Sequence, residues 1–466
     1  MLNAIGVAHQ QLGEYPRALE AYTSASEARG RIGDDRGLAS TLRNRAMVNL
    51  ALGRSRDAEG DLERARSLFQ KIGDRSGQAD VQNDFGLLHE GRGAYGPALA
   101  AYQDALKIRR GLGDERLISQ SYDNVGYIYY LQGEYDNALV YWKQALDLRR
   151  RIGEKNGVVL SVQNMGFLQT AQGKWDEALK SFVEALEGSR QIGFKNAEAI
   201  SLGNIAAISG YRGRFGAALE SFDASLAILR PLDLKPALAE FTLKEAEVRL
   251  LLGQMEEVRK RLDVARAWLK ETENREQSAD LETLQGVWNS ARGEAEPARR
   301  AFARALALAK ESGSRAAMLD SRIAAASAAV DRGEAAASAD LARALQEAES
   351  LGHALLTIRA AEGLARAEAA RGRWTRAEEL ARRALRIADQ CGWEAGRYRL
   401  TLLLARALEK QGNRAGSEDA YLRAAREVVK LRDNVPAAMR PAFDSVPTVR
   451  EALSRRPADA RAKLGG

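Results

Sequence analysis

Apolar and polar residues alternate along this chain with the spacing of amphipathic helices, and the same arrangement returns about every 40 residues. In residues 118–152, Val125 and Ile128 precede a short glycine-containing turn, and Ala138 and Trp142 follow it. Apolar residues three and four positions apart share one face of a helix. Each period therefore predicts two helices joined by a turn.

A glycine marks that turn in every period, with eight steps of 40 residues, then one of 39 and one of 40: Gly13, Gly53, Gly93, Gly133, Gly173, Gly213, Gly253, Gly293, Gly333, Gly372 and Gly412. A fixed period of this size is typical of a solenoid, in which each unit packs only on its neighbours. A second glycine, such as Gly153, is predicted to end the second helix in the left-handed conformation that glycine adopts at little cost.

Small residues recur inside the predicted helices. The position seven before each turn is always glycine or alanine: Gly6, Ala46, Gly86, Gly126, Gly166, Ala206, Ala246, Gly286, Ala326, Ala365 and Ala405. Alanines follow the turn by five and by twelve residues in the first repeats, and a large residue such as Tyr102, Trp142 or Phe182 stands between them. We expect this alternation to let the two helices approach to about 8–10 Å.

The predicted fold is an all-α, right-handed α-solenoid of about eleven helix-turn-helix repeats with a short C-terminal capping tail. Residues 1–232 hold six regular repeats, and 233–431 hold five degenerate, alanine-rich ones. Between them, residues 229–236 lack the glycine and contain Pro231 and Pro236, which predicts a kink or boundary near residue 233. Residues 432–466 form a proline-bearing basic tail, predicted to be partly disordered, with a short helix over Val449–Arg455.

The repeat resembles the tetratricopeptide repeat (TPR), whose pattern places Gly-x-x-Tyr before the turn and Ala-x-x-x-Phe and Ala after it. Gly126 and Tyr129, then Ala138, Trp142 and Ala145, are close to that pattern. The period is 40 rather than 34, with an Ile-Gly-Asp turn at residues 32–34 and 72–74. This longer form resembles the repeats of kinesin light chain and of cell-polarity adaptors that bind G-protein regulators.

Composition places few further limits on function. The single cysteine, Cys391, cannot form an internal disulfide, and neither a signal peptide nor an apolar run of about 18 residues is present, so we expect a cytoplasmic protein without membrane association. The net charge is +7, and residues 371–466 hold 21 Lys and Arg against 12 Asp and Glu. A basic end could favour an acidic partner, but a solvated surface is the simpler interpretation.

Candidate chemistry is sparse. Residues 91–96 match G-x-G-x-x-G by letter, but they lie on a predicted inter-helix turn, without the strand that a dinucleotide site requires. His9 and His89 occupy equivalent positions two repeats apart and cannot share a metal. His353 is the third histidine, and Cys391 has no histidine partner nearby in the sequence. We therefore predict no catalytic residue, no metal, no cofactor and no small-molecule substrate.

The first helix of each repeat is expected to line the concave wall of the solenoid, as it does in TPR proteins. Asparagines stand there at equivalent positions, and each carboxamide offers a donor and an acceptor that match an extended peptide backbone. Nearby aromatic residues would add apolar pockets. The predicted peptide-binding residues are Arg43, Asn44, Asn83, Asp84, Asn124, Tyr127, Tyr130, Asn164, Phe167, Asn204 and Tyr211. The alternative is that these amides bond to the adjacent repeat and hold the stack together.

The favoured function is a non-catalytic scaffold or adaptor that binds a peptide or helix of a partner protein in this groove. A second hypothesis is the sensor arm of a longer bacterial signalling protein fused to a kinase, cyclase or NTPase, because Met1 falls about two residues inside the first predicted helix. Nucleic-acid binding is disfavoured, since few aromatic residues accompany the basic end. The partner's identity and the oligomeric state, including a homo-oligomer, are left open.

Overall fold

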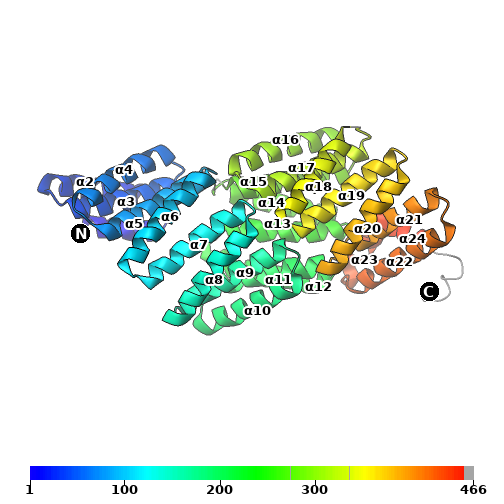
Figure 1. Ribbon diagram of the computed structural model, residues 1–466, viewed down its shortest axis with the longest axis horizontal. Coiled ribbons are helices and arrows are strands. Elements are labelled where there is room, and N and C mark those ends of the chain that lie inside the picture. Colours follow the sequence, from blue (N-terminus) through cyan, green and yellow to red (C-terminus); the bar gives the residue numbers. More distant parts are fainter. Residues whose placement is uncertain (273, 335, 456–466) are drawn as a thin grey trace. The chain divides into compact units, whose positions relative to one another are not determined.

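The computed structural model describes residues 1–272, 274–334 and 336–455, and within them every regular element is helical (Figure 1). The chain divides into two compact units. Unit 1 comprises Met1–Ser161 with Glu311–Gly313, and unit 2 comprises Val162–Lys310 and the residues from Ser314 on. The helix α9 (Lys155–Ala171) contributes residues to both units.

The helices of unit 1 are α1 (Leu2–Gln11), α2 (Tyr15–Ile32), α3 (Asp35–Ala51), α4 (Ser55–Lys71), α5 (Arg75–Gly91), α6 (Tyr95–Leu112), α7 (Glu115–Leu131) and α8 (Tyr135–Ile152). Each odd-numbered helix forms a hairpin with the next one, and successive hairpins pack side by side. This is the predicted order of helix, turn and helix, with one hairpin per period.

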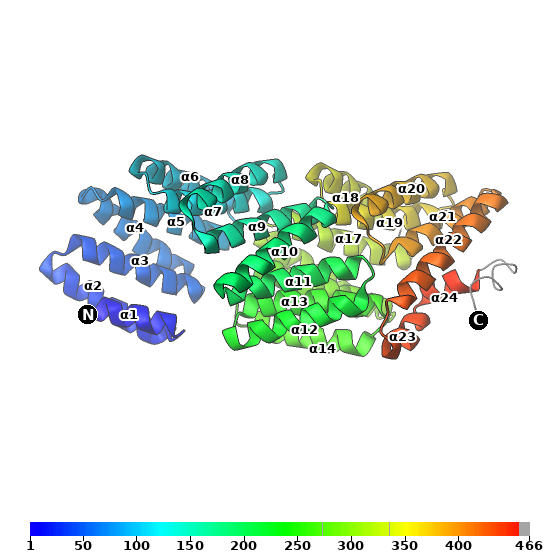
Figure 2. The ribbon, with the colours of Figure 1, turned by 90° about the horizontal axis from the view of Figure 1, so that it is seen from below.

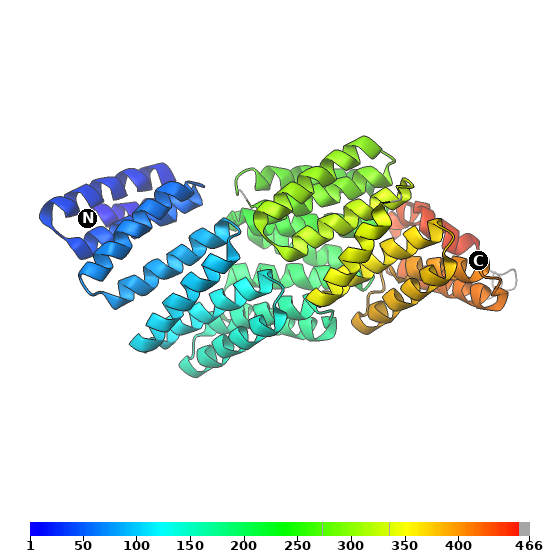
Figure 3. The same cartoon turned by 45° about the horizontal axis from the view of Figure 1, so that its top comes forward.

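Unit 2 continues the series with α10 (Trp175–Ile192), α11 (Lys195–Tyr211), α12 (Phe215–Leu229), α13 (Lys235–Leu251), α14 (Met255–Leu269), α15 (Arg275–Ala291), α16 (Ala295–Ser312), α17 (Arg315–Asp331), α18 (Ala337–Leu351), α19 (Ala354–Ala370), α20 (Trp374–Cys391), α21 (Arg397–Lys410) and α22 (Arg414–Asp433). From green to orange in Figure 3, its hairpins follow one another in chain order. The predicted all-α solenoid is confirmed.

The Ile-Gly-Asp turn has a simple physical basis. Gly33 ends α2 with φ of 72°, in the left-handed region, and its backbone N–H bonds to the last carbonyls of that helix. The next residue, Asp34, caps α3, because its side chain accepts a hydrogen bond from the N–H of Gly37. Two residues therefore end one helix and start the next, which leaves room for an 18-residue second helix within the 40-residue period.

The predicted pairing of small and large residues is also present. A Cβ atom at Gly86 would lie 2.3 Å from the ring of Tyr102, and one at Gly126 would lie 2.7 Å from the ring of Trp142. The aromatic side chain of the second helix therefore occupies the space that a side chain on the first helix would need. Tyr102 and Trp142 are each 1% exposed, so the cost of glycine within a helix is offset by close packing.

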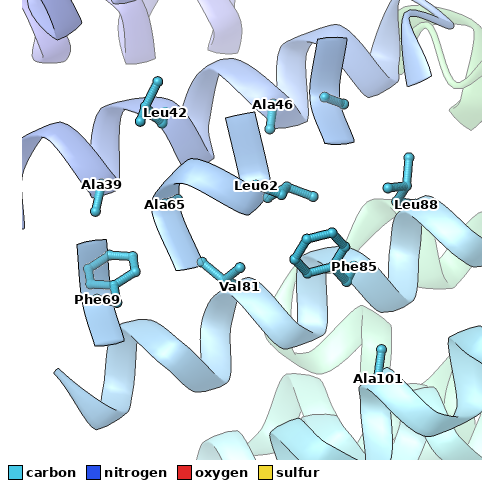
Figure 4. Packing of buried hydrophobic residues seen from close by; sticks show 11 residues of the cluster. Ala39, Leu42, Ala46, Leu62, Ala65, Phe69, Val81, Phe85, Leu88 and Ala101 are labelled. Carbon is cyan, nitrogen blue, oxygen red and sulfur yellow. The ribbon is translucent and has the colours of Figure 1, made fainter. Parts of the chain in front are cut away.

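The hydrophobic core follows the same register from hairpin to hairpin. In unit 1, side chains from α3, α4 and α5 meet in one cluster, where Leu62 and Phe69 face Val81 and Phe85 (Figure 4). In unit 2, α13, α14 and α15 form an equivalent cluster around Leu262. In each unit the core thus lies between first and second helices, as expected for stacked repeats.

The irregular segment near residue 233 forms a short 3-10 helix, η1 (Arg230–Leu232). Asp233 follows with φ of 50° and takes the left-handed position that glycine holds at other hairpin junctions, such as Gly33 and Gly193. The two compact units meet in the sequence at Ser161, whereas the change from regular to degenerate repeats near residue 233 lies inside unit 2. A structural boundary at residue 233 stays a prediction.

The C-terminal tail contains η2 (Ala437–Met439), α23 (Arg440–Ser445) and α24 (Pro447–Ser454). The last of these covers most of the predicted helix Val449–Arg455, and its Val449 and Ala452 are buried. It packs on α22 and α21, the hairpin of the last repeat. The predicted disorder concerns in part residues 456–466, which lie outside the described residues.

Candidate functional site

The charged residues on the first helices of unit 1 are paired with one another. Arg43 on α3 donates to Asp84 on α5 at 2.5 Å and to Asp80 at 2.9 Å. Asp84 is 3% exposed, and its burial raises its pKa above the ordinary value, which the ion pair with Arg43 offsets only in part. Two predicted binding residues, Arg43 and Asp84, therefore join neighbouring repeats.

The asparagines of unit 1 also bond between repeats. The side-chain amide of Asn124 donates to the Oδ1 of Asn83 at 2.8 Å, and that of Asn44 donates to the Oδ1 of Asn3 at 3.5 Å. Asn83 also accepts from Arg109 at 3.5 Å. These contacts correspond to the alternative considered for the row, in which the amides hold the stack, and they leave part of each carboxamide for a ligand.

Aromatic side chains gather at the end of α7. Tyr130 lies 5.6 Å, between ring centroids, from both Tyr135 and Trp142, so its ring is part of the packing between α7 and α8. Tyr127 is different, because it is 41% exposed. Of the predicted aromatic residues in unit 1, Tyr127 is therefore the one that offers the larger surface to a partner.

The remaining predicted residues lie in unit 2. The side-chain amide of Asn164 makes no hydrogen bond within the described part of the chain. The ring of Phe167 packs edge-on against Phe182 at 5.5 Å. Asn204 is 5% exposed, donates to the carbonyl of Ile200 at 2.8 Å and accepts from Lys244 at 3.3 Å. Asn164 thus keeps its amide available, whereas Asn204 does not.

Tyr211, at the end of α11, leads to a charged surface that the sequence analysis missed. Its ring stacks on Trp175 at 5.3 Å, and its hydroxyl donates to Glu247 on α13 at 3.4 Å. Glu247 in turn lies 3.7 Å from the guanidinium of Arg359 on α19, which also donates to Asp320 on α17 at 2.9 Å. Side chains from four first helices thus converge, although Glu247 and Arg359 belong to repeats three periods apart.

This surface is called the inner face of unit 2 below, and its residues are Tyr211, Glu240, Glu247, Glu276, Asp280, Asp320 and Arg359. Most of the charges come from one repeat position, which is occupied in chain order by Ser40, Asp80, Gln120, Leu160, Ile200, Glu240, Asp280, Asp320, Arg359 and Arg399. Three consecutive carboxylates are followed by two guanidiniums. The row is visible in the sequence when this position is compared from repeat to repeat, and it differs from the position of the asparagines.

Asp280 is the least compensated charge on the inner face. It is exposed and has neither a hydrogen bond nor an ion pair within the described residues, whereas Asp320 pairs with Arg359 and Glu240 pairs with Lys244 at 2.6 Å. The protein around Asp280 removes part of its hydration, and the nearby carboxylates of Glu276, Asp320, Glu247 and Glu240 repel its charge. Both effects raise the pKa of Asp280 well above its ordinary value.

The basic side chains beside these carboxylates, those of Arg359 and His353, keep their usual charge states. Burial alone would lower the pKa of Arg359, but Asp320 and Glu247 raise it above its ordinary value. Burial lowers the pKa of His353 to about 4, so this imidazole is neutral at physiological pH. Its Nδ1 accepts the N–H of Leu356 at 3.4 Å and caps α19. The uncompensated charge of the inner face is therefore negative and centred on Asp280.

Chemistry of other kinds has little support in the described residues. They contain no group of three or more His, Cys, Asp or Glu side chains that could hold a metal ion. Cys391 is buried, and burial raises the pKa of its thiol to about 11. Gly93, the central glycine of the G-x-G-x-x-G match, lies in the turn between α5 and α6. Among the described helices, none combines the length and the apolar character that a membrane span requires.

Two family models, both described as tetratricopeptide repeat, match this chain. One matches residues 1–71, 38–111 and 158–230, and the other matches residues 119–152 and 357–388. The chain belongs to the tetratricopeptide repeat family. A search of curated proteins finds no significant match. The predicted resemblance is thus confirmed at the level of the family, and the family and fold indicate a protein-interaction scaffold.

Three solved structures are similar to this chain, and the first of them shows the same fold. A Rap protein complexed with competence and sporulation factor has a TM-score of 0.57 and 16% sequence identity, and the match covers 73% of this chain and 97% of the Rap chain. The apo form of RapI has a TM-score of 0.49 and 15% identity, covering 58% and 97%. BtubC (BKLC) from P. vanneervenii has a TM-score of 0.42 and 19% identity, covering 47% and 92%.

Proposed function

We propose that this chain is a non-catalytic scaffold that holds an extended, basic segment of a partner protein on the inner face of unit 2. The observation that carries the proposal is Asp280, an exposed carboxylate that has no partner in the described part of the chain and lies among four other carboxylates. A lysine, an arginine or a free amino group of a ligand would supply the missing positive charge. Such complementary charges favour the correct partner and repel acidic ones.

Two further groups of unit 2 support a peptide rather than a simple cation. Asn164 has an amide without a partner in the described residues, and Tyr211 offers aromatic surface and a hydroxyl beside the charges. An amide can pair with a peptide backbone, and an aromatic ring can pack on a side chain. The Rap protein of similar fold is complexed with competence and sporulation factor, so this fold is known with a bound factor.

The predicted groove of unit 1 is a second candidate surface. Tyr127 is 41% exposed there, but Arg43, Asn44, Asn83, Asp84 and Asn124 already bond across neighbouring repeats. A ligand would have to compete with those bonds or use the acceptors they leave. For this reason we assign the principal site to unit 2 and a supporting role to unit 1. We also propose a cytoplasmic setting, without a nucleic-acid or membrane partner.

The test uses short probes of defined charge. Fluorescein-labelled pentapeptides of the form Gly-Ala-X-Ala-Gly, with X as Lys, Arg, Gln or Glu, would be titrated by fluorescence polarisation against the wild-type chain. The Lys and Arg peptides should bind more tightly than the Glu peptide, and Asp280→Asn should weaken them about tenfold, as expected for the loss of about 1.4 kcal/mol. Glu187→Gln on α10 is the matched control, because Glu187 is exposed on a second helix.

Three results would contradict the proposal. Absence of binding by every probe would remove the inner face as a peptide site. Equal binding of the Lys and Glu peptides would show that charge does not select the ligand. Equal weakening in Asp280→Asn and Glu187→Gln would show that the peptides respond to net charge alone.

A further inference from the structure

An early repeat of unit 2, the α11–α12 hairpin, contacts its last repeat, although more than 150 residues separate them in the sequence. The backbone N–H of Ala395, just before α21, donates to the carbonyl of Tyr211, at the end of α11, at 3.0 Å. A Cβ atom at Gly213 would lie 2.2 Å from the Leu431 side chain, which belongs to α22. The repeats of unit 2 therefore coil far enough for its two ends to meet beside the inner face.

The short helix α23 makes a second connection between those ends. Figure 2 shows it beside the ends of α12 and α14. Its Phe443 is 1% exposed and lies 6.4 Å, between ring centroids, from Phe215 on α12. The carbonyl of Ala442 approaches the α13–α14 turn so closely that a Cβ atom at Gly253 would lie 2.6 Å from it. The N–H of Gly216 also donates to the carbonyl of Asn434 at 3.4 Å.

The tail is held much more firmly to the last repeats than to these early ones. Glu451 on α24 accepts from Arg406 on α21 at 2.8 Å, and Asp444 accepts from Arg432 on α22 at 2.8 Å. Tyr398 and Thr448 are also hydrogen-bonded, at 3.1 Å. Against α12–α14, α23 offers one buried side chain, Phe443, and its backbone. If the connection opens, the tail stays on α21 and α22 and leaves Phe215 and Gly253.

We propose that α23 is a clasp that closes unit 2 around its inner face and opens to admit a ligand. This proposal rests on the proposed function, since it concerns access to the same surface. Tyr211 links the two, because its carbonyl takes part in the closure while its hydroxyl faces Glu247 on the inner face. Because the tail is held weakly on α12–α14 and strongly on α21 and α22, the clasp has two discrete positions.

A matched pair of glycine substitutions tests the closure. Gly253 and Gly293 occupy equivalent turns with φ of 71° and 77°, so an alanine strains the backbone equally at both. Only at Gly253 would the new Cβ atom meet the tail, because nothing lies within 4 Å of the position at Gly293. Gly253→Ala should therefore open the clasp, and Gly293→Ala should not. Phe443→Ala removes the buried side chain and provides an independent second variant.

The first measurement is hydrogen–deuterium exchange of the full chain, followed by mass spectrometry. In Gly253→Ala and Phe443→Ala, the segments containing Gly216 and Ala395 should exchange about tenfold faster, which corresponds to about 1.4 kcal/mol. Gly293→Ala should leave them unchanged, and the α21–α22 hairpin should keep its protection in all three variants. Equal exchange of the two segments in all three variants would overturn the proposal.

The second measurement tests access without any ligand. In a Cys391→Ser background, a cysteine introduced by Asp280→Cys would be labelled with fluorescein maleimide, a bulky reagent, and with a small methanethiosulfonate. Phe443→Ala should accelerate the bulky reagent at position 280 about tenfold and leave a Glu187→Cys control unchanged. No acceleration would show that the clasp does not control access. Because neither measurement uses a peptide, the results can contradict the clasp proposal without contradicting the proposed binding of basic peptides, and the reverse also holds.

Discussion

Unit 1 and unit 2 are built from the same repeat, but they use its polar positions in opposite ways. In unit 1, buried arginines at the ends of the second helices join successive hairpins: Arg109 donates to Ser121 at 2.9 Å, and Arg149 donates to Ser161 at 2.8 Å. The same repeat position is the apolar Phe69 in one repeat of unit 1, and unit 2 has Ser189 there, followed by Leu229, Leu269 and Ala309, all of which are buried. From Leu229 on, unit 2 thus uses apolar contacts at a position where most repeats of unit 1 use an arginine and its polar bonds.

The first helices of the two units also differ in how their polar groups are paired. In unit 1 the polar groups facing the next repeat satisfy one another, as Arg43 does with Asp80 and Asp84. On the inner face of unit 2, Asp280 has no partner within the described residues. A buried and paired charge contributes to holding a fold together, whereas an exposed and unpaired one is available to a ligand. This difference is the reason why we propose the binding site in unit 2 rather than in unit 1.

Replacing an arginine on a first helix should give the largest difference between the units in the free energy of unfolding. Arg43→Ala would leave the buried Asp84 carboxylate unpaired and should lower the free energy of unfolding by about 3–5 kcal/mol. Arg359→Ala should cost less than about 1 kcal/mol, because its partners Asp320 and Glu247 are half-buried and water can replace the arginine. Urea unfolding followed by circular dichroism measures both, with Arg31→Ala, on an exposed residue, as control. Equal losses at the two sites would refute the distinction.

A smaller effect should be the same in both units, because the core between the helices is the same. A Cβ atom would lie 2.7 Å from Trp142 at Gly126 in unit 1 and 2.5 Å from Phe302 at Gly286 in unit 2. Gly126→Ala and Gly286→Ala should each destabilise the fold by about 1–3 kcal/mol through overpacking. Combining each with Trp142→Leu or Phe302→Leu should relieve the clash. If the partner substitution brings no relief in urea unfolding, backbone effects dominate instead.

Replacing an asparagine should also affect stability and binding differently in the two units. Asn124→Ala removes the bond to Asn83 and should cost about 0.5–1.5 kcal/mol of stability. Asn164→Ala breaks no bond within the described residues, and its effect on stability should be within about 0.5 kcal/mol. The binding of the basic pentapeptides should respond in the opposite order, with the larger loss in Asn164→Ala. Loss of binding confined to Asn124→Ala would move the site to unit 1.

The smallest expected effect is the pH dependence of Asp280. Because its pKa is raised in the folded chain, the folded state binds the proton more tightly than the unfolded state. Stability from this group is therefore lost as the pH rises from the ordinary carboxyl pKa, about 3.9, through the raised value. Asp280→Asn should raise the Tm at pH 7 and have no effect near pH 3. A lower Tm for the variant at pH 7, measured by differential scanning fluorimetry, would contradict this assignment.

Much of the fold was predictable because the local contacts of a repeat protein recur with the period of its sequence. The turn glycines, the Ile-Gly-Asp junctions and the pairing of Gly126 with Trp142 all concern residues within one repeat or at its junction with the next. Each of these contacts recurs at intervals of about 40 residues, so a single sequence shows it many times. The asparagine row was located in the same way, but whether an amide faces a ligand or its neighbour depends on distances that the pattern does not contain.

By itself, the sequence determined the family, the all-α solenoid, the position of its hairpins and the alternation of small and large residues in its core. Only the tertiary structure decided that Glu247 meets Arg359, that Asp280 has no partner among the residues the structure describes, and that α23 returns to Phe215. The reason is physical: the sequence period specifies contacts between adjacent repeats, whereas contacts between distant ones depend on small rotations that accumulate over several repeats.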